Sequence, residues 1–142
     1  MISILTGIDS TASALEAERV RMDVVAQNIA NANTTRGPDG KPYQRQQVVF
    51  ESVLRAQQSG ASANGAQKVQ VARIQKDTRP PRMIYNPGHP DADSHGMVAT
   101  PDINIHQEMV DMISSSRSYD ANVAVVKNAR AIAMQALSIG KH

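Results

Sequence analysis

The residues with the clearest capacity for chemistry are the carboxylates and imidazoles of the segment HPDADSHG, residues 89–96. Counted from Asp91, Gly96 stands at the sixth position, and Asp102, which lies beyond this segment, stands at the twelfth. This is the spacing of a calcium-binding loop. His95 is a poor calcium ligand, however, and the twelfth position of such loops prefers a bidentate glutamate. A zinc ion could instead be bound by two histidines and two aspartates, which are His89, Asp91, Asp93 and His95. A metal-binding regulatory module is therefore one hypothesis for the function.

A turn without any ion is a simpler interpretation of the same residues. The calcium loop of an EF-hand follows a helix, and the sequence NPGHP at residues 86–90 does not permit a helix there. Aspartate side chains in such a segment accept hydrogen bonds from nearby backbone N–H groups. We therefore expect a tight turn and no bound metal at residues 89–96.

Other kinds of site are poorly supported by the composition. The 142 residues include four histidines but no cysteine, which excludes disulfides and thiolate chemistry. No serine stands in the usual G-x-S-x-G or S-x-x-K frame, and GPDGKP is too short for a phosphate-binding loop. A net charge of +2 with one Phe, three Tyr and no Trp does not indicate nucleic-acid binding. The sequence therefore predicts no enzyme, no cofactor and no nucleic-acid partner, and no apolar run is long enough to predict direct insertion into a membrane.

Both ends of the chain show the seven-residue apolar periodicity of long helices that pack lengthwise against other helices. The N-terminal series consists of Met1, Ile8, Leu15, Met22 and Ile29, with Leu5 in the second position of the stripe. The two C-terminal series consist of Ile105, Met112, Tyr119, Val126 and Ala133, and of Met109, Ser116, Val123, Arg130 and Leu137. We predict a helix over about residues 3–31 and a second helix near the C-terminus, and we assign the large apolar members of these series to an assembly interface.

The ends of the two predicted helices carry recognisable signals. The first helix ends among polar residues, namely Asn28, Asn31, Asn33 and Thr34. They can form a C-terminal cap, and they can also add a contact to a neighbouring subunit. For the second helix, Thr100 before Pro101 is one possible start and Asn104 is a later one. Gly140, followed by Lys141, is expected to end it.

The chain between the helices has a different composition. Residues 34–102 contain all seven prolines and six of the eight glycines, so regular helix is not expected through most of this segment. Two runs of β-forming residues predict strands over residues 43–50 and 68–74, the second with Val69 and Val71 alternating with polar neighbours, and shorter strands are expected at residues 83–85 and 97–99. We therefore divide the chain into an N-terminal assembly helix (1–33), an extended middle segment with short strands (34–102) and a C-terminal assembly helix (103–142).

The predicted fold class is mainly α, with long N- and C-terminal helices packed as a coiled-coil-like pair and joined by the extended middle segment. Two paired helices cover only half of each other, yet further apolar residues flank both stripes: Ile4, Val25, Val110, Ile113, Met134 and Ile139. Uncovered apolar surface favours association with further helices. The sequence therefore predicts a polymerising subunit, and a coiled-coil adaptor that forms a discrete dimer is the rival hypothesis.

Four stretches of the sequence resemble flagellar basal-body rod proteins, and among them the proximal-rod subunits. These stretches are RMDVVAQNIANANTTR, GKPYQRQQVVFESVL, YNPGHPDADSHGMV and EMVDMISSSRSYDANVAVVKNARAIAMQAL. The resemblance spans nearly the whole chain, and only residues 55–67 look unmarked. The resemblance implies a structural subunit of the bacterial flagellum without catalytic activity. Its terminal helices would stack with copies of itself and other rod subunits around a narrow channel, forming a drive shaft that transmits torque across the periplasm.

The resemblance also implies how the protein would reach that place. Rod and hook subunits are exported without a cleaved signal by the flagellar type III apparatus, whose gate recognises a Phe followed four residues later by an apolar residue. Phe50 and Leu54 match this motif. The alternative for Phe50 is simple packing under the middle segment.

Overall fold

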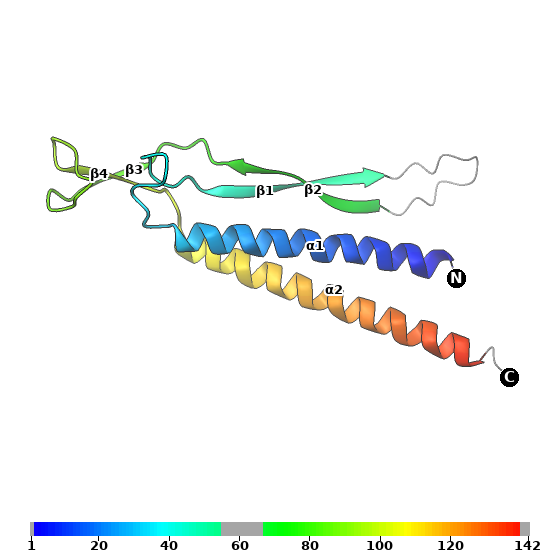
Figure 1. The fold of residues 1–142 in the computed structure, drawn as a ribbon. Coiled ribbons are helices and arrows are strands. Elements are labelled where there is room, and N and C mark those ends of the chain that lie inside the picture. Colours follow the sequence, from blue (N-terminus) through cyan, green and yellow to red (C-terminus); the bar gives the residue numbers. More distant parts are fainter. Residues whose placement is uncertain (1, 55–66, 140–142) are drawn as a thin grey trace.

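The computed structural model describes residues 2–54 and 67–139, which form two long helices and two small β-hairpins (Figure 1). The elements are α1 (Ile2–Ala30), β1 (Gln46–Leu54), β2 (Gln67–Lys76), β3 (Arg82–Tyr85), β4 (Met97–Thr100) and α2 (Ile105–Ile139). The predicted fold class is confirmed, since long terminal helices pack on each other and short strands lie between them in the sequence.

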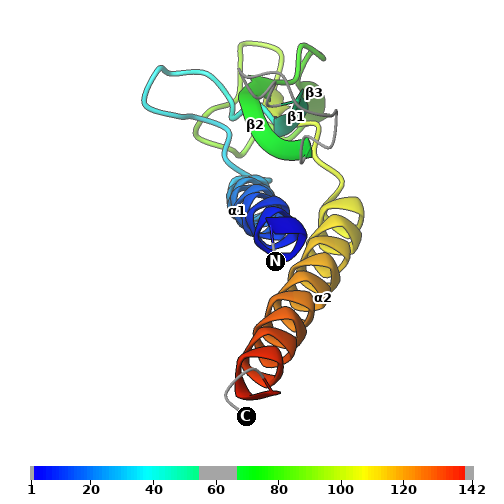
Figure 2. The same cartoon turned by 90° about the vertical axis from the view of Figure 1, so that its right-hand side faces the viewer.

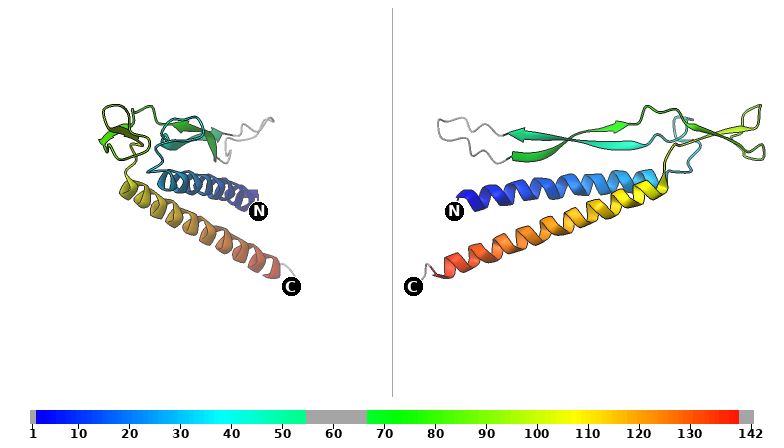
Figure 3. Two further views of the ribbon diagram at one scale, coloured as in Figure 1. Left: turned by 60° about the vertical axis from the view of Figure 1, so that its left-hand side comes forward. Right: turned by 180° about the vertical axis from the view of Figure 1, so that it is seen from behind.

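Helix α1 lies between the other two layers of the molecule. It contacts α2 on one side and both strands of the β1–β2 hairpin on the other, an arrangement that is plain when the molecule is turned by a quarter (Figure 2). The two helices run antiparallel, close together where α1 ends and α2 begins, and they diverge toward the N- and C-termini (Figures 1 and 3). The helix pair therefore has a closed end and an open end.

The β1–β2 hairpin runs along α1, and its register contains one irregularity. Val49 pairs with Arg73 and Phe50 pairs with Val71, so Ala72 is an extra residue in β2. Strand β1 begins at Gln46 rather than at the predicted residue 43, and both strands extend a few residues beyond the predicted ends. The short β3–β4 hairpin was predicted almost to the residue, and it projects beyond the closed end of the helix pair (Figure 1).

Helix α2 begins at the later of its two predicted starts. The Asn104 Oδ1 atom accepts hydrogen bonds from the backbone N–H groups of His106 (3.1 Å) and Gln107 (3.4 Å), as an N-cap does. Thr100 instead ends β4, where it pairs with Arg82, so the start at Thr100 was wrong. The predicted C-terminal signals at Gly140 and Lys141 lie outside the described residues.

The apolar core is small. The buried apolar side chains are Ala17, Val24, Val25, Ala32 and Val98. The three largest fully buried side chains are all polar: Glu108, Asn28 and Ser115. Neither described helix is apolar enough over a sufficient length to cross a lipid bilayer. The described part of the subunit thus joins its elements through polar contacts as much as through an apolar interior.

Candidate assembly interface

Most of the predicted interface residues are partly covered within the subunit. On α1, Ile8, Leu15, Met22 and Ile29 are half-buried. On α2, Ile105, Met112, Tyr119, Val123 and Val126 are half-buried as well. Met109 and Leu137 are instead 50% and 61% exposed, and the side chain of Leu5 lies outside the described residues. The seven-residue series therefore identify the partly covered stripe of each helix, except at these positions.

Helix α2 carries several large apolar side chains that the described residues leave at least half exposed. Its exposed apolar side chains are Met109, Val110, Ile113, Val125, Ile132, Met134, Leu137 and Ile139. Over residues 7–30 of α1, by contrast, no large apolar side chain is exposed to this degree. We call the eight exposed side chains of α2 the exposed face of α2.

A groove of about 240 Å³ lies between the diverging halves of the two helices. It is lined by Gly7, Ile8 and Thr11 of α1 and by Val125, Val126, Ala129 and Ile132 of α2. Val125 and Ile132 also belong to the exposed face of α2, so the groove shares two of its lining residues with that face.

The closed end of the helix pair is held by the side chain of Asn28, which is fully buried. Its Nδ2 atom donates hydrogen bonds to the carbonyl oxygen of Gln46 (2.8 Å) and to Glu108 Oε2 (2.9 Å). Its Oδ1 atom accepts hydrogen bonds from the backbone N–H of Gln46 (2.9 Å) and from the Tyr43 hydroxyl (3.1 Å). The amide thereby makes two donor and two acceptor bonds, and it joins α1 to the start of β1 and to α2.

Glu108, which is 1% exposed, brings a negative charge into the same cluster. Its Oε1 atom accepts a hydrogen bond of 2.6 Å from Arg45 Nε, and Arg45 also lies 3.9 Å from Asp111 of α2. Asp111 also pairs with Arg21 of α1, whose Nη2 atom lies 3.8 Å from Asp111 Oδ1. Burial, and secondarily the negative charge of Glu108, raise the pKa of the Tyr43 hydroxyl above its ordinary value. Because a buried carboxylate requires a partner, Arg45 is needed here for Glu108 to remain charged at low cost.

The other residues of the predicted helix-end group make local contacts. Asn31 Nδ2 donates to the carbonyl oxygen of Gln27 (2.9 Å), and the Thr34 hydroxyl donates to Asn31 Oδ1 (3.2 Å). Asn33 is exposed. Asn31 and Thr34 therefore act at the helix end, whereas Asn28 binds residues far away in the sequence, a role that sequence reasoning missed because nothing local to Asn28 marks Glu108 as its partner.

Comparisons with known proteins agree with this architecture. Two family models match the two ends of the chain: "Flagella basal body rod protein" over residues 8–38 and "Flagellar basal body rod FlgEFG protein C-terminal" over residues 94–139. The flagellar basal-body rod protein FlgC of Yersinia enterocolitica is 41% identical over 140 residues, which cover 99% of this chain and 100% of that protein. FlgC of Bacillus subtilis is 41% identical, covering 94% of this chain and 96% of that protein, and FlgC of Salmonella typhimurium is 36% identical, covering 99% and 100%.

The chain belongs to the FlgC family of flagellar basal-body rod proteins. It is thus a structural, non-enzymatic subunit of the flagellar basal-body rod.

The segment that resembled a calcium loop forms a turn in this rod protein. Asp93 Oδ1 accepts hydrogen bonds from the backbone N–H groups of His95 and Met97, both at 2.8 Å. These bonds, led by the one from Met97, hold the pKa of the Asp93 carboxyl below its ordinary value. Asp91 accepts a hydrogen bond from the Thr35 hydroxyl at 2.7 Å. The aspartates are thereby engaged by the protein itself.

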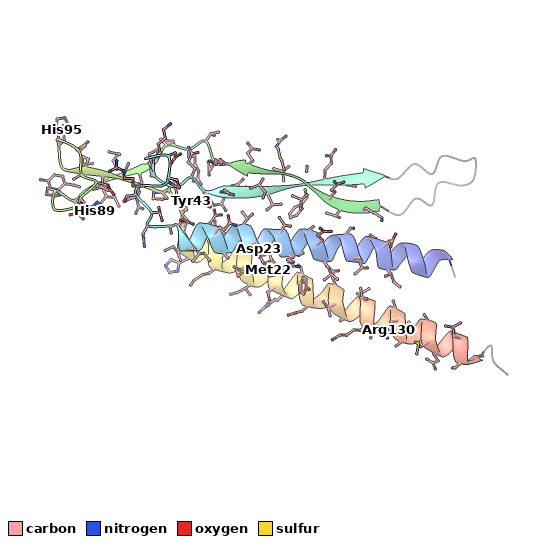
Figure 4. All side chains as sticks on the ribbon, viewed as in Figure 1. Met22, Asp23, Tyr43, His89, His95 and Arg130 are labelled. Carbon is pink, nitrogen blue, oxygen red and sulfur yellow. The ribbon has the colours of Figure 1, made fainter. Side chains whose placement is uncertain are left out.

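Of the remaining candidate metal ligands, His89 lies beside another candidate among the described residues, with its Nδ1 atom 4.0 Å from Asp91 Oδ2. Asp102 Oδ2 lies 3.0 Å from Arg79 Nη1, near the start of α2. His89 and His95 occupy different parts of the loops beyond the closed end of the helix pair (Figure 4). No group of three or more side chains suited to hold a metal ion occurs among residues 2–54 and 67–139.

Phe50 of the proposed export motif lies in β1 and is 38% exposed. It lines a groove of about 350 Å³ between the hairpin and the helices, together with Val24 and Arg21 of α1. Leu54 is the last residue of β1, and its side chain lies outside the described residues. Phe50 therefore takes part in packing on α1 in the folded rod protein.

Proposed function

We propose that this rod protein belongs to the proximal rod, and that it polymerises through α1 and α2 with copies of itself and with other rod subunits. The resulting drive shaft transmits torque across the periplasm. The observation that carries this proposal is the exposed face of α2, where eight large apolar side chains on one helix are at least 50% exposed.

The physical reason for assembly is the removal of this surface from water. Burying apolar surface contributes about 25 cal/mol per Å², so covering several such side chains along a helix is strongly favourable. We propose that the exposed face of α2 meets a different surface of the next copy, so that the contact joins unlike surfaces. Contacts of this head-to-tail kind extend into a filament when they do not close into a ring.

Stiffness follows from the same packing. Helices that pack lengthwise interlock their side chains at many successive positions. Sliding one helix past another would unseat several of these contacts at once, in an interior that deforms little. A shaft built in this way resists twisting without any chemical step.

Ile132→Asp tests the proposal at a residue that belongs both to the exposed face of α2 and to the groove beside α1. Ile132 is 59% exposed, so the purified chain should keep its helix content and its urea midpoint. In a strain that lacks its own copy of the protein, the variant should fail to enter isolated basal bodies, and the cells should not swim. Lys127→Asp, on an exposed polar position of the same helix, is the matched control and should support swimming. Normal swimming with Ile132→Asp would contradict the proposal, and a discrete dimer in dilute solution would favour the adaptor hypothesis.

We further propose that Phe50 and Leu54 are recognised by the flagellar type III export gate before the subunit folds. Phe50→Ala should then reduce the amount of protein that leaves the cytoplasm, as measured by immunoblots of cell fractions. Val48→Ala, two residues earlier in β1, is the control for strand packing. Equal export of both variants would show that Phe50 acts only in the folded protein.

A further inference from the structure

We propose that Asn28 is a positioning residue that sets where β1 begins along α1 and, through Glu108, holds the start of α2 at the same point. The contact that supports this is the pairing of one side-chain amide with both backbone groups of Gln46, at 2.8 and 2.9 Å. Gln46 is the first residue of β1. The Asn28 amide thus binds the start of β1 as a neighbouring strand would.

The chemistry of the cluster requires an amide at this position. The Gln46 carbonyl and the Glu108 carboxylate can only accept hydrogen bonds, so the group facing them must donate two. The Gln46 N–H and the Tyr43 hydroxyl both donate to the opposite side of Asn28, which must accept. Among side chains of this size only asparagine combines these properties. Aspartate would place an oxygen against two acceptors.

The position matters because apolar packing specifies the register only weakly in this molecule. The hairpin packs on the face of α1 opposite α2, and several of its side chains are exposed, among them Val69 at 37% and Ile74 at 49%. A slip of one residue would turn every side chain of a strand to the opposite face. A buried polar contact resists such a slip, because it loses its hydrogen bonds when it is displaced. Asn28 thereby determines which hairpin surface the subunit presents outward.

Helix α2 is tied to the same point. Glu108 accepts from Asn28 through Oε2 and from Arg45, which directly precedes β1, through Oε1. The start of α2, the end of α1 and the start of β1 therefore meet at one buried cluster. The cluster thereby fixes the exposed face of α2 relative to the hairpin. Its importance for assembly rests on the proposed function.

Asn28→Asp in the full chain tests the positioning role with a change of one group. Backbone amide exchange of residues 43–50, measured by mass spectrometry, should become at least about tenfold faster, since buried acceptors lose their donor. Asn31→Asp is the matched control, because Asn31 lies one helical turn away and binds only Gln27 and Thr34. Its exchange over residues 43–50 should equal that of the wild type.

A paired variant separates a specific contact from general loss of folding. Glu108→Gln alone sets an amide against the Asn28 amide and should also speed exchange. When Glu108→Gln is combined with Asn28→Asp, however, the new amide in α2 can donate to the new carboxylate in α1 while its oxygen still accepts from Arg45. The double variant should therefore exchange more slowly over residues 43–50 than Asn28→Asp alone, even if that single variant is largely unfolded.

Two results would overturn the proposal: exchange in Asn28→Asp no faster than in Asn31→Asp, or a double variant no slower than Asn28→Asp. These measurements use the purified chain, so they do not depend on rod assembly. Swimming of the same variants tests the link to assembly separately. Fast exchange with normal swimming would support the positioning role and contradict its importance for assembly.

Discussion

Helices α1 and α2 are similar in length and both follow seven-residue apolar series, but their surroundings differ sharply. Helix α1 lies between the β1–β2 hairpin and α2, and it buries Ala17, Val24, Val25 and Asn28. Helix α2 packs against α1, and its fully buried residues are Glu108 and Ser115 alone. Among the helix side chains that the structure describes, which in α1 begin at Gly7, all eight exposed large apolar ones belong to α2.

This difference shows that one periodic pattern serves two purposes in the same chain. Around α1, the pattern completes the subunit, because the hairpin and α2 cover it from two sides. Along α2, eight large apolar side chains remain at least 50% exposed and available for contacts with other molecules. Substitutions at buried positions of α1 should therefore act on the folding of the monomer. Substitutions in the exposed face of α2 should act on assembly.

The largest expected effect comes from placing the same charge at a valine of each helix. Val24 of α1 is 3% exposed and Val125 of α2 is 53% exposed. Val24→Asp should lower the free energy of unfolding by more than about 3 kcal/mol, because it buries an unpaired charge. Val125→Asp should change it by less than about 0.5 kcal/mol. Urea unfolding followed by circular dichroism measures both values.

Both variants should nevertheless fail to enter the rod, one for lack of a folded subunit and the other for lack of a contact. Equal loss of monomer stability in the two variants would contradict the distinction between the helices. Rod incorporation of Val125→Asp would show that this part of α2 stays uncovered in the assembly.

The next effect concerns the polar cluster that joins the two helices. Arg45→Ala should cost about 3 kcal/mol, since it leaves the buried carboxylate of Glu108 without its cationic partner. Arg36→Ala is the control, because Arg36 is 72% exposed where it lies 3.7 Å from Asp91. An exposed pair of this kind contributes at most about 1 kcal/mol. If the two arginine variants unfolded at the same urea concentration, the cluster would have no special role in holding α2.

Much of the fold could be predicted from the sequence, because its helices and strands follow local rules. The series from Met1 to Ile29 predicted α1. Two β-type runs predicted β1 and β2, and the short strands β3 and β4 were also expected. The cluster could not be predicted in this way, since Asn28 and Glu108 are 80 residues apart. A single sequence does not show which distant polar residues meet.

The errors at element ends have the same physical origin. β1 was predicted to begin at residue 43, but Tyr43 bonds Asn28 with its hydroxyl and the strand begins at Gln46, whose backbone also binds Asn28. Threonine is a residue type that often caps helices, yet Thr100 lies in β4 and pairs with Arg82 of β3. Asn104 caps α2 instead. In both cases a tertiary contact decided between local alternatives.

A smaller effect is expected at the first turn of α2. Asn104→Ala removes the acceptor for two backbone N–H groups and should lower the free energy of unfolding by about 1 kcal/mol. Amide exchange should rise at His106 and Gln107 and stay unchanged in α1. Thr100→Ala, which removes only the 2.9 Å bond to the Arg82 carbonyl, serves as the control and should leave α2 unaffected. Faster exchange at the start of α2 in the Thr100 variant alone would reverse the assignment of the cap.

The smallest effect should be a pH dependence of the free energy of unfolding. It arises at the joint between the two hairpins, namely the segment between β2 and β3, where Arg79 contacts Asp77 and also Asp102, which lies just before α2. Arg79 donates to Asp77 from Nε (2.8 Å) and Nη2 (2.6 Å), and its Nη1 lies 3.0 Å from Asp102. The hydrogen bonds from the Arg79 side chain, before any other cause, lower the pKa of Asp77 from its ordinary value of 3.8.

Because the pKa of Asp77 is lower in the folded than in the unfolded chain, its contribution to stability is fully present above 3.8 and disappears as the pH falls through the lower folded pKa. Asp77→Asn should therefore unfold slightly more easily than the wild type at neutral pH, and the difference in urea midpoint should vanish in acid. The effect is small because Arg79 is 55% exposed and water screens the pair. A difference that persists unchanged below the folded pKa would mean that Asp77 acts through its shape and not its charge. The joint would then anchor α2 by packing, as the hairpin anchors α1.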